Sequence, residues 1–342
     1  MRKKIFNIIK FSFLLGFGIF LLFVFVPRKY NVPKMQKRES TKYWDLPTGS
    51  RIGYVIIPAK GIKKSYPIIY LHGGPGGIIT DETIKMLSPL SENGYDVYLY
   101  DQIGSGHSGR LKNIEEYTVD RHKRDLEEII MKTGARKVIL IGQSWGAMLS
   151  TQFLADNPEK VEKLILTGPG PILPVRQELA GIKIPDSIRL KEPLYSNRQA
   201  NKKTWSLRIK AISLWAIIFG SKLASDKEAD DFQTYLTNEL NKSTVCDTSN
   251  ALKAEGGSGF YAHLMTLQSF NRVKDPRPRL RDLQIPVLVM KGECDNQKWG
   301  YTNEYLEFFP NHRLVIIPGA GHSIAVEQPK LYLNVIREFL NE

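Results

Sequence analysis

Residues 137–158 read KVILIGQSWGAMLSTQFLADNP, and this stretch is the most informative in the chain. The run VILI predicts a short buried strand, and AMLSTQFLA predicts a helix that follows it directly. Between the two lies Gly142-Gln-Ser-Trp-Gly146, a G-x-S-x-G pattern. A serine between a strand and a helix sits on a tight turn with its Oγ above the carboxyl edge of the sheet, and the flanking glycines leave room for neighbouring backbone. The pattern therefore predicts a nucleophile, Ser144, at this edge.

The rest of the chain repeats the strand and helix alternation around this stretch. Such alternation predicts βαβ units, a mostly parallel sheet and an α/β fold. Thr118 and Gly134 are start and stop signals for one crossover helix. The expected strands are 52–57, 68–71, 97–100, 138–141, 164–166, 287–290 and 314–317.

The alternation stops after residue 166 and resumes near residue 287. The intervening sequence indicates helices, such as one over 205–220, so we expect an inserted helical cap. The expected organisation is an N-terminal segment over 1–38, a first core part over 39–170, the cap over 171–280 and a second core part over 281–342.

A serine nucleophile needs a histidine base and an orienting carboxylate, which in this strand order follow the serine as acid and then histidine. His322, in Pro-Gly-Ala-Gly-His, follows the last strand at the correct edge, whereas His312 precedes that strand. The strand PVLVMKG ends in Glu293-Cys-Asp295, which lies at the same edge. We expect Asp295 to be the acid, with Glu293 as the alternative.

Backbone N–H groups near the serine are also needed, because a tetrahedral intermediate carries an oxyanion. The strand PIIYL leads into His72-Gly-Gly-Pro-Gly-Gly77, a loop with few side chains in the way of a ligand. We expect the N–H groups of Gly74 and Trp145 to bind the oxyanion. His72 is expected to hold this loop and not to act as a second base.

Five motifs together resemble the α/β-hydrolase superfamily, and within it the proline iminopeptidase family. They are HGGPGG at 72–77, DQIGSGHSG at 101–109, GQSWGA at 142–147, GECD at 292–295 and GAGH at 319–322. The resemblance covers roughly residues 50 to 342. It implies a Ser144, Asp295, His322 triad, oxyanion donors at Gly74 and Trp145, and a helical cap.

The resemblance further implies acyl transfer to water on peptides with a free N-terminus, often proline. It implies a cap carboxylate that binds the substrate amine, for which Glu255 is the candidate. No metal and no organic cofactor are expected. Two alternatives stay open: a carboxylesterase or lipase with the same chemistry, and a catalytically idle membrane-bound binding protein.

The N-terminal segment is basic and apolar. Residues 1–38 hold nine Lys/Arg and no Asp/Glu of the 48 and 35 in the chain, which leaves 39 basic against 35 acidic residues downstream. The body carries only +4, so the sequence does not indicate a nucleic-acid partner. Residues 5–26 are mostly apolar, which predicts a single-pass membrane anchor, with a cleaved signal peptide as the alternative.

We expect the catalytic domain outside the cytoplasm, because only Met1 to Lys4 would then remain inside as a charged stub. Two cysteines, Cys246 and Cys294, are too few for a disulfide framework or a four-ligand metal site. The sequence leaves open whether they pair with each other, and it leaves the oligomeric state open.

Overall fold

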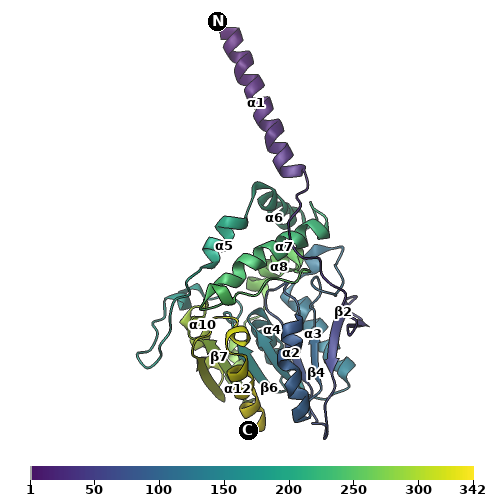
Figure 1. Cartoon of the computed structure of the whole chain (residues 1–342), viewed down its shortest axis with the longest axis vertical. Helices are drawn as coiled ribbons and strands as arrows, with labels where there is room; N and C mark the ends of the chain where they lie inside the picture. The colour runs from purple at the N-terminus through teal and green to yellow at the C-terminus, as the bar shows by residue number, and fades with distance from the viewer. Residues whose placement is uncertain (1) are drawn as a thin grey trace.

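A computed structural model describes residues 2–342 and places one mixed eight-stranded sheet at the centre of the body (Figure 1). The strand order is β1-β2-β4-β3-β5-β6-β7-β8; β2 pairs antiparallel with β1 and β4, and the other pairings are parallel. The strands are β1 (Lys42–Asp45), β2 (Arg51–Ile57), β3 (Ile68–Leu71), β4 (Val97–Tyr100), β5 (Val138–Gln143), β6 (Val161–Thr167), β7 (Val287–Gly292) and β8 (His312–Ile317).

All seven expected strands are present, and the additional strand is β1. Its sequence, KYWD, lacks an apolar run because it is an edge strand whose side chains are mostly exposed. The α/β fold and the mostly parallel sheet are confirmed.

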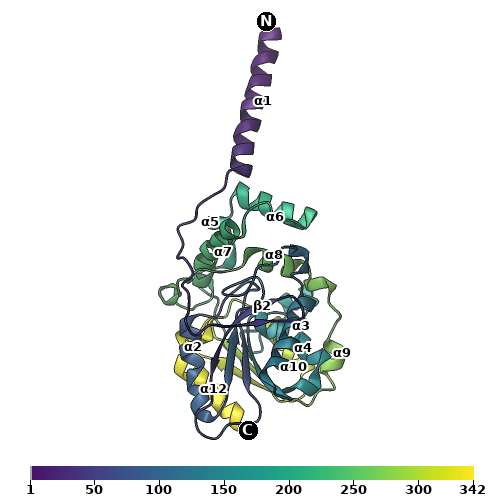
Figure 2. The same cartoon turned by 90° about the vertical axis from the view of Figure 1, so that its right-hand side faces the viewer.

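The α-helices occupy both faces of the sheet and its carboxyl edge (Figures 1 and 2). They are α1 (Arg2–Phe25), α2 (Asp81–Leu87), α3 (Val119–Thr133), α4 (Trp145–Asp156), α5 (Asn197–Thr204), α6 (Leu207–Phe219), α7 (Asp226–Leu240), α8 (Phe260–Gln268), α9 (Arg277–Leu280), α10 (Trp299–Phe308), α11 (Ile324–Glu327) and α12 (Pro329–Asn341).

Two apolar clusters, one on each side of the sheet, form the core. Strand β5 contributes to both, since Val138 and Leu140 belong to one cluster and Ile139 and Ile141 to the other. Helices α3, α4 and α10 pack in the first cluster, whereas α2 and α12 pack in the second. A strand that is buried on both faces has an uninterrupted apolar sequence, which is why the run VILI at 138–141 predicts this strand.

Helices α5 to α8 follow β6 and lie over the carboxyl ends of the strands (Figure 1). The helix expected over 205–220 is confirmed as α6, which begins two residues later than expected. Ser206 caps α6 by accepting a hydrogen bond from the Ile209 N–H, and Gly220, with φ of 59°, ends it. The boundaries of the cap at 171 and 280 stay a prediction.

Helix α1 projects from the body at the end where α6 lies (Figures 1 and 2). Within the part of the chain that the structure describes, no helix is both long and apolar enough to cross a membrane. The membrane span was expected over residues 5–26, and some side chains of this range lie outside the described part of the structure. Met1 lies outside it entirely.

Candidate active site

The turn between β5 and α4 holds Ser144 in a strained conformation. Ser144 has φ of 54° and ψ of −116°, and it is the one non-glycine residue with positive φ among the described residues. Such backbone costs about 1 to 3 kcal/mol and persists only where the surroundings impose it. Its N–H donates to the Thr167 carbonyl oxygen at 2.9 Å. The serine side chain is therefore held at the carboxyl edge of β5, half exposed.

Both glycines of the G-x-S-x-G pattern are needed by this turn. A Cβ on Gly142 would come within 2.6 Å of the Ala147 nitrogen, and a Cβ on Gly146 would overlap the Leu71 carbonyl oxygen. These neighbours are backbone atoms, which cannot move aside as a flexible side chain can. The pattern in the sequence thus records close packing of backbone around Ser144.

The loop 72–77 lies directly beside Ser144. A Cβ on Gly73 would stand 3.1 Å from the Ser144 Cβ, and Gly74 has φ of 127° with Gly77 N and Gly76 N close by. Gly74 lines the same cavity as Ser144, whereas Trp145 follows Ser144 as the first residue of α4. The Trp145 ring is buried and stacks on Phe270 with 5.3 Å between centroids.

Gln102 connects the loop 72–77 to the turn between β5 and α4. This role of Gln102 was not predicted from the sequence. Its amide nitrogen donates to the His72 carbonyl oxygen at 3.0 Å, and its amide oxygen accepts from the Trp145 indole N–H at 2.7 Å. The Gln102 backbone N–H donates to His72 Nε2 at 2.9 Å. Burial lowers the pKa of His72, so the ring is a neutral structural group, as expected.

His322 and Asp295 meet at the carboxyl edge, beyond β8 and β7. His322 Nδ1 lies 2.8 Å from Asp295 Oδ1, and the Asp295 side chain is fully buried. Burial opposes ionisation of Asp295, but the charges of His322 and Lys291 outweigh it and hold the pKa at about 2. The ionised carboxylate therefore fixes the ring so that Nδ1 donates and Nε2 is left to act.

Lys291 contributes to this pair from β7. Its Nζ lies 3.2 Å from Asp295 Oδ2, and both side chains are buried. A lysine in the buried run VLVMK is the signal that could have indicated a buried carboxylate partner, since an unpaired charge there would be costly.

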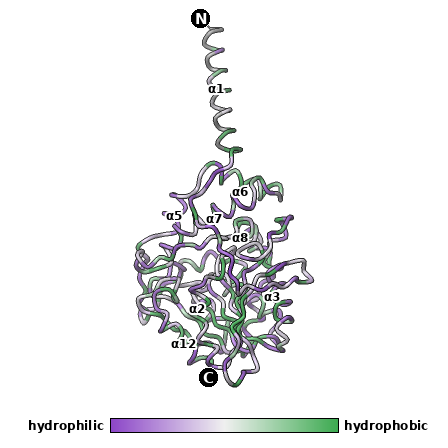
Figure 3. Tube along the Cα trace, turned by 45° about the vertical axis from the view of Figure 1, so that its right-hand side comes forward, coloured by the Kyte–Doolittle hydropathy of each residue, from purple (hydrophilic) through white to green (hydrophobic). Residues whose placement is uncertain are grey.

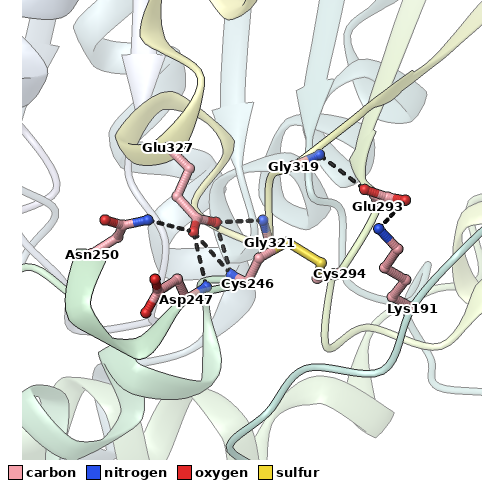
Figure 4. The surroundings of a disulfide bond; sticks show 9 residues. All are labelled: Lys191, Cys246, Asp247, Asn250, Glu293, Cys294, Gly319, Gly321 and Glu327. Atoms are coloured by element: carbon pink, nitrogen blue, oxygen red, sulfur yellow. Dashed lines mark hydrogen bonds and ion pairs between the residues drawn. A yellow bond between two sulfur atoms is a disulfide. The ribbon is translucent and has the colours of Figure 1, made fainter.

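Glu293, the alternative acid, lies elsewhere. It accepts from the Gly319 N–H at 3.0 Å and pairs with Lys191 at 2.9 Å (Figure 4). Both partners lower its pKa, the Gly319 N–H most. The structure thus places Asp295, and not Glu293, against His322.

A disulfide joins Cys246 to Cys294, which directly precedes Asp295 (Figure 4). Cys246 belongs to the segment between β6 and β7, so the bond ties that segment to the loop after β7. The Cys294 N–H also donates to the Ala320 carbonyl oxygen at 2.9 Å. The pairing that the sequence left open is therefore present.

Glu327 makes a second tie at the same place. Its carboxylate accepts N–H groups from Cys246 at 2.9 Å, Asp247 at 3.2 Å and Gly321 at 2.7 Å (Figure 4). The Asn250 amide donates to it as well, at 3.1 Å. Gly321 precedes His322, so Glu327 links the histidine loop to residues 246–250. No sequence pattern indicated this carboxylate.

Ser144, Gly74 and His322 all line one cavity of about 600 Å³. Among the described residues, no hydrogen bond joins Ser144 to His322. Helix α7 supplies part of the opposite wall through Gln233 and Thr237. The cavity thus opens between the carboxyl edge of the sheet and the helices above it.

Two carboxyl groups share the wall of this cavity. Glu255, the expected amine-binding residue, lies there beside Glu82, to which it is hydrogen-bonded. Burial, and after it the Glu82 carboxylate, raise the pKa of Glu255 to about 7. Below about pH 7 the pair therefore holds one proton and one negative charge. Within residues 2–342 the structure places no cluster of His, Cys, Asp and Glu that could hold a metal ion.

Residues 66–329 match the model of the alpha/beta hydrolase fold family. The chain belongs to this family. The match spans the sheet from β3 to β8 and every residue that lines the cavity except Tyr332, so this α/β hydrolase is an enzyme of the hydrolase class.

Relatives of this α/β hydrolase are named for different activities. A proline iminopeptidase from Lactobacillus delbrueckii subsp. bulgaricus is 27% identical over 304 residues, covering 86% of this chain and 96% of the relative. A putative 2-succinyl-6-hydroxy-2,4-cyclohexadiene-1-carboxylate synthase from Bacillus subtilis is 26% identical over 284 residues, covering 82% and 92%.

Solved structures show the same fold. An esterase from Exiguobacterium antarcticum superposes with a TM-score of 0.60 at 17% identity, covering 88% of this chain and 99% of that one. A proline iminopeptidase from Mycobacterium smegmatis superposes with a TM-score of 0.57 at 20% identity, covering 88% and 98%.

Proposed function

We propose that this α/β hydrolase is a serine aminopeptidase that releases N-terminal residues from short peptides through an acyl-enzyme. The observation that carries the chemistry is the Asp295–His322 hydrogen bond of 2.8 Å, with Ser144 on its strained turn lining the same cavity as His322.

In the proposed mechanism His322 Nε2 takes the proton of Ser144 Oγ as that oxygen attacks the scissile carbonyl carbon. The negative charge that develops on the carbonyl oxygen is met by the N–H groups of Gly74 and Trp145. Protonated His322 then gives its proton to the leaving amine, and the bond between carbonyl carbon and nitrogen breaks. Water, deprotonated by His322, then attacks the acyl carbon. The bond between that carbon and Ser144 Oγ breaks, and His322 returns the proton to Oγ.

The substrate class is supported by the carboxyl pair of Glu82 and Glu255 in the cavity wall. A half-buried site with one shared proton favours a cationic group over a neutral one. The ammonium of a free peptide N-terminus is such a cationic group. The similarity to a proline iminopeptidase supports the same substrate class. An ester substrate has no such group.

A side-by-side assay on the full chain in detergent tests this proposal. We expect prolyl arylamides to be cleaved faster than short-chain nitrophenyl esters, and acetylation of the prolyl nitrogen to remove the preference. Equal rates on free and acetylated substrates would contradict the aminopeptidase assignment. Absence of labelling by a fluorophosphonate would contradict the hydrolase chemistry at Ser144 and favour an idle binding protein.

The second candidate is a carboxylesterase or lipase, favoured by the apolar N-terminal segment, which would bring the site close to lipids. The same assay separates it from the peptidase, because faster ester turnover without an effect of the free amine selects it.

We also propose that residues 5–26 anchor the enzyme in a membrane with the catalytic domain outside the cytoplasm. The run of residues 11–26 has no charge, and the Cys246–Cys294 disulfide suits an oxidising compartment. The protein should resist extraction by high salt and carbonate, because burial of apolar area is not screened by ions. Release by salt would contradict the anchor, and full protection from protease added to spheroplasts would contradict the orientation.

A further inference from the structure

Helix α6 is apolar on both of its faces, but only one of them is buried. Ile209, Ile212 and Ala216 pack in the core. The opposite side, called here the α6 face, exposes between 37% and 60% of six large apolar side chains: Leu207, Leu214, Trp215, Ile217, Ile218 and Phe219. A helix that is apolar all round is expected to be buried all round, so the α6 face is suited to an apolar partner.

The α6 face lies at the end of the body from which α1 emerges (Figures 1 and 2). Arg208 of α6 donates to the Val24 carbonyl oxygen near the end of α1, and Phe25 and Val26 add exposed apolar area at the same place. Figure 3 shows hydrophobic colour on α6 and at the base of α1.

The segment after α1 is bound to the body, and these contacts hold the end of α1 next to α6. The Arg28 N–H donates to Glu228 Oε1 at 2.9 Å, and Glu228 pairs with Arg208 at 2.8 Å. The Tyr30 ring lies 5.6 Å from that of Phe232 in α7. A membrane that received α1 would therefore meet the α6 face as well.

Exposed cations lie on α5, on α6 itself and in the segment after α1, next to the α6 face. Arg28, Lys29, Lys202 and Lys210 are exposed, and none of them has a carboxylate within 4.0 Å in the described part of the chain. Of the acidic side chains nearby, Glu228 is already paired with Arg208, and Glu115 lies beside Gly220 at the far end of α6. An apolar stripe bordered by cations is the pattern of a helix that lies in the interface of an anionic bilayer.

We propose that the α6 face lies in the headgroup and acyl boundary of a membrane with anionic lipids and seats the enzyme there. This goes beyond the proposed hydrolase chemistry and does not depend on it. A second copy of the chain is a poorer occupant, because bringing two such faces together would oppose the four unpaired cations of each.

Depth-dependent quenching on the full-length protein in vesicles tests the proposal. The native cysteines are joined to each other, so a single introduced cysteine takes an environment-sensitive fluorophore selectively. Leu214→Cys reports the α6 face, Leu14→Cys reports α1, and Ile62→Cys, 93% exposed in the loop before β3 and far from α1, is the matched control. Ile218→Cys repeats the α6 measurement if the first variant folds poorly.

We expect brominated acyl chains in phosphatidylglycerol-containing vesicles to quench the labels at 214 and 218 at a depth of ~5 to 10 Å, and not the label at 62. Labels at 214 and 218 that behave like the label at 62 would overturn the proposal, even if the label at 14 is quenched and the anchor holds. Equal quenching on zwitterionic vesicles would overturn the assignment of anionic lipids. If the label at 214 became shielded from water in lipid-free detergent as the protein concentration rose, the α6 face would be assigned to a second copy of the chain instead.

Discussion

The proposed site has a nucleophile half, around Ser144, and a base half, around His322, and the two are held in place in different ways. Residues 142–146 are held by backbone packed against glycines, next to the buried strands β3 and β5. The loop 72–77 beside them is bound in addition by the Gly259 N–H, which donates to the Gly76 carbonyl oxygen at 2.7 Å. Residues 292–297 and 319–323 are held instead by partners far along the chain. The Cys246–Cys294 disulfide spans 48 residues, and the Glu327 carboxylate reaches Cys246 across 81.

This difference makes the base half dependent on the helices above the sheet. The Ser323 N–H donates to the Thr244 carbonyl oxygen at 2.8 Å, and a Cβ on Gly321 would come within 2.5 Å of that same oxygen. A shift of residues 244–250 would therefore displace His322, whereas Ser144 would keep its place on β5. The following changes test this contrast.

Ser144→Ala should have the largest effect, a loss on the order of 10⁶ in kcat with folding intact, because the nucleophile is removed and its scaffold is not. Turnover of a prolyl arylamide and thermal unfolding are the measurements. Fluorophosphonate labelling that persists in the variant would remove Ser144 from the proposed mechanism.

Asp295→Asn should lower kcat on the order of 10⁴, because an amide leaves a base in place but disfavours the tautomer with the proton on Nδ1. Glu293→Gln is the matched control, since this carboxylate is two residues away and binds Gly319 and Lys191 instead. If the control proved the more damaging change, Asp295 would not be the acid.

Replacing both Cys246 and Cys294 by Ala should lower the free energy of unfolding by ~4 kcal/mol, the chain-entropy value for a loop of this length. We further expect a lower kcat, because the loop that carries Asp295 loses its tie. Chemical denaturation and steady-state kinetics measure the two effects. Unchanged kcat in the folded variant would show that the base half does not need the disulfide.

Glu327→Gln should reduce kcat by up to ~10², since an amide nitrogen cannot accept the N–H groups and a displacement of about 1 Å at His322 costs that much. KM should change little, because Glu327 does not line the cavity. Glu338→Gln, which removes a surface ion pair with Arg313, is the control and should be silent. A thermal unfolding midpoint that falls to the assay temperature would assign the loss in kcat to unfolded enzyme instead of mispositioning.

Glu255→Gln should have the smallest effect, an increase of about 10-fold in KM for free-amine substrates only, because one charge-assisted hydrogen bond is lost. The pKa of about 7 also sets a pH dependence. Below that pH the Glu82–Glu255 pair holds a proton, and above it the pair gains a second negative charge. The ratio of kcat/KM on amine and ester substrates should rise through about pH 7 and fall again near pH 8 as the substrate amine deprotonates.

Using this ratio cancels any pH effect on the steps that both substrate classes share. A ratio that is flat with pH in the wild type, or one that keeps its rise in Glu255→Gln, would exclude Glu255 from the amine site. Glu82→Gln is the companion variant, because it removes the partner that raises the pKa of Glu255.

Much of the fold could be predicted from the sequence, because seven strands and the helix from Thr118 to Gly134 are specified by neighbouring residues. Helix caps, the apolar runs of strands and the glycines that end helices each depend on a few neighbouring residues, so they can be recognised from the sequence without a structure. The failures lie where that local signal is weak. Strand β1 was not expected, because it is short and its side chains are mostly exposed.

The sequence by itself determined the strand, turn and helix around Ser144 and the glycine loop beside it, because those contacts are made by residues that are adjacent in the chain or by backbone that only glycine can approach. It narrowed the acid to Asp295 or Glu293 but could not separate two carboxylates that are two positions apart. Only the tertiary structure decided that Asp295 meets His322, that Cys246 pairs with Cys294, and that Glu82 lies beside Glu255. Those pairs join segments from 27 to 173 residues apart, and their meeting depends on the path of the whole chain and not on the residues between them.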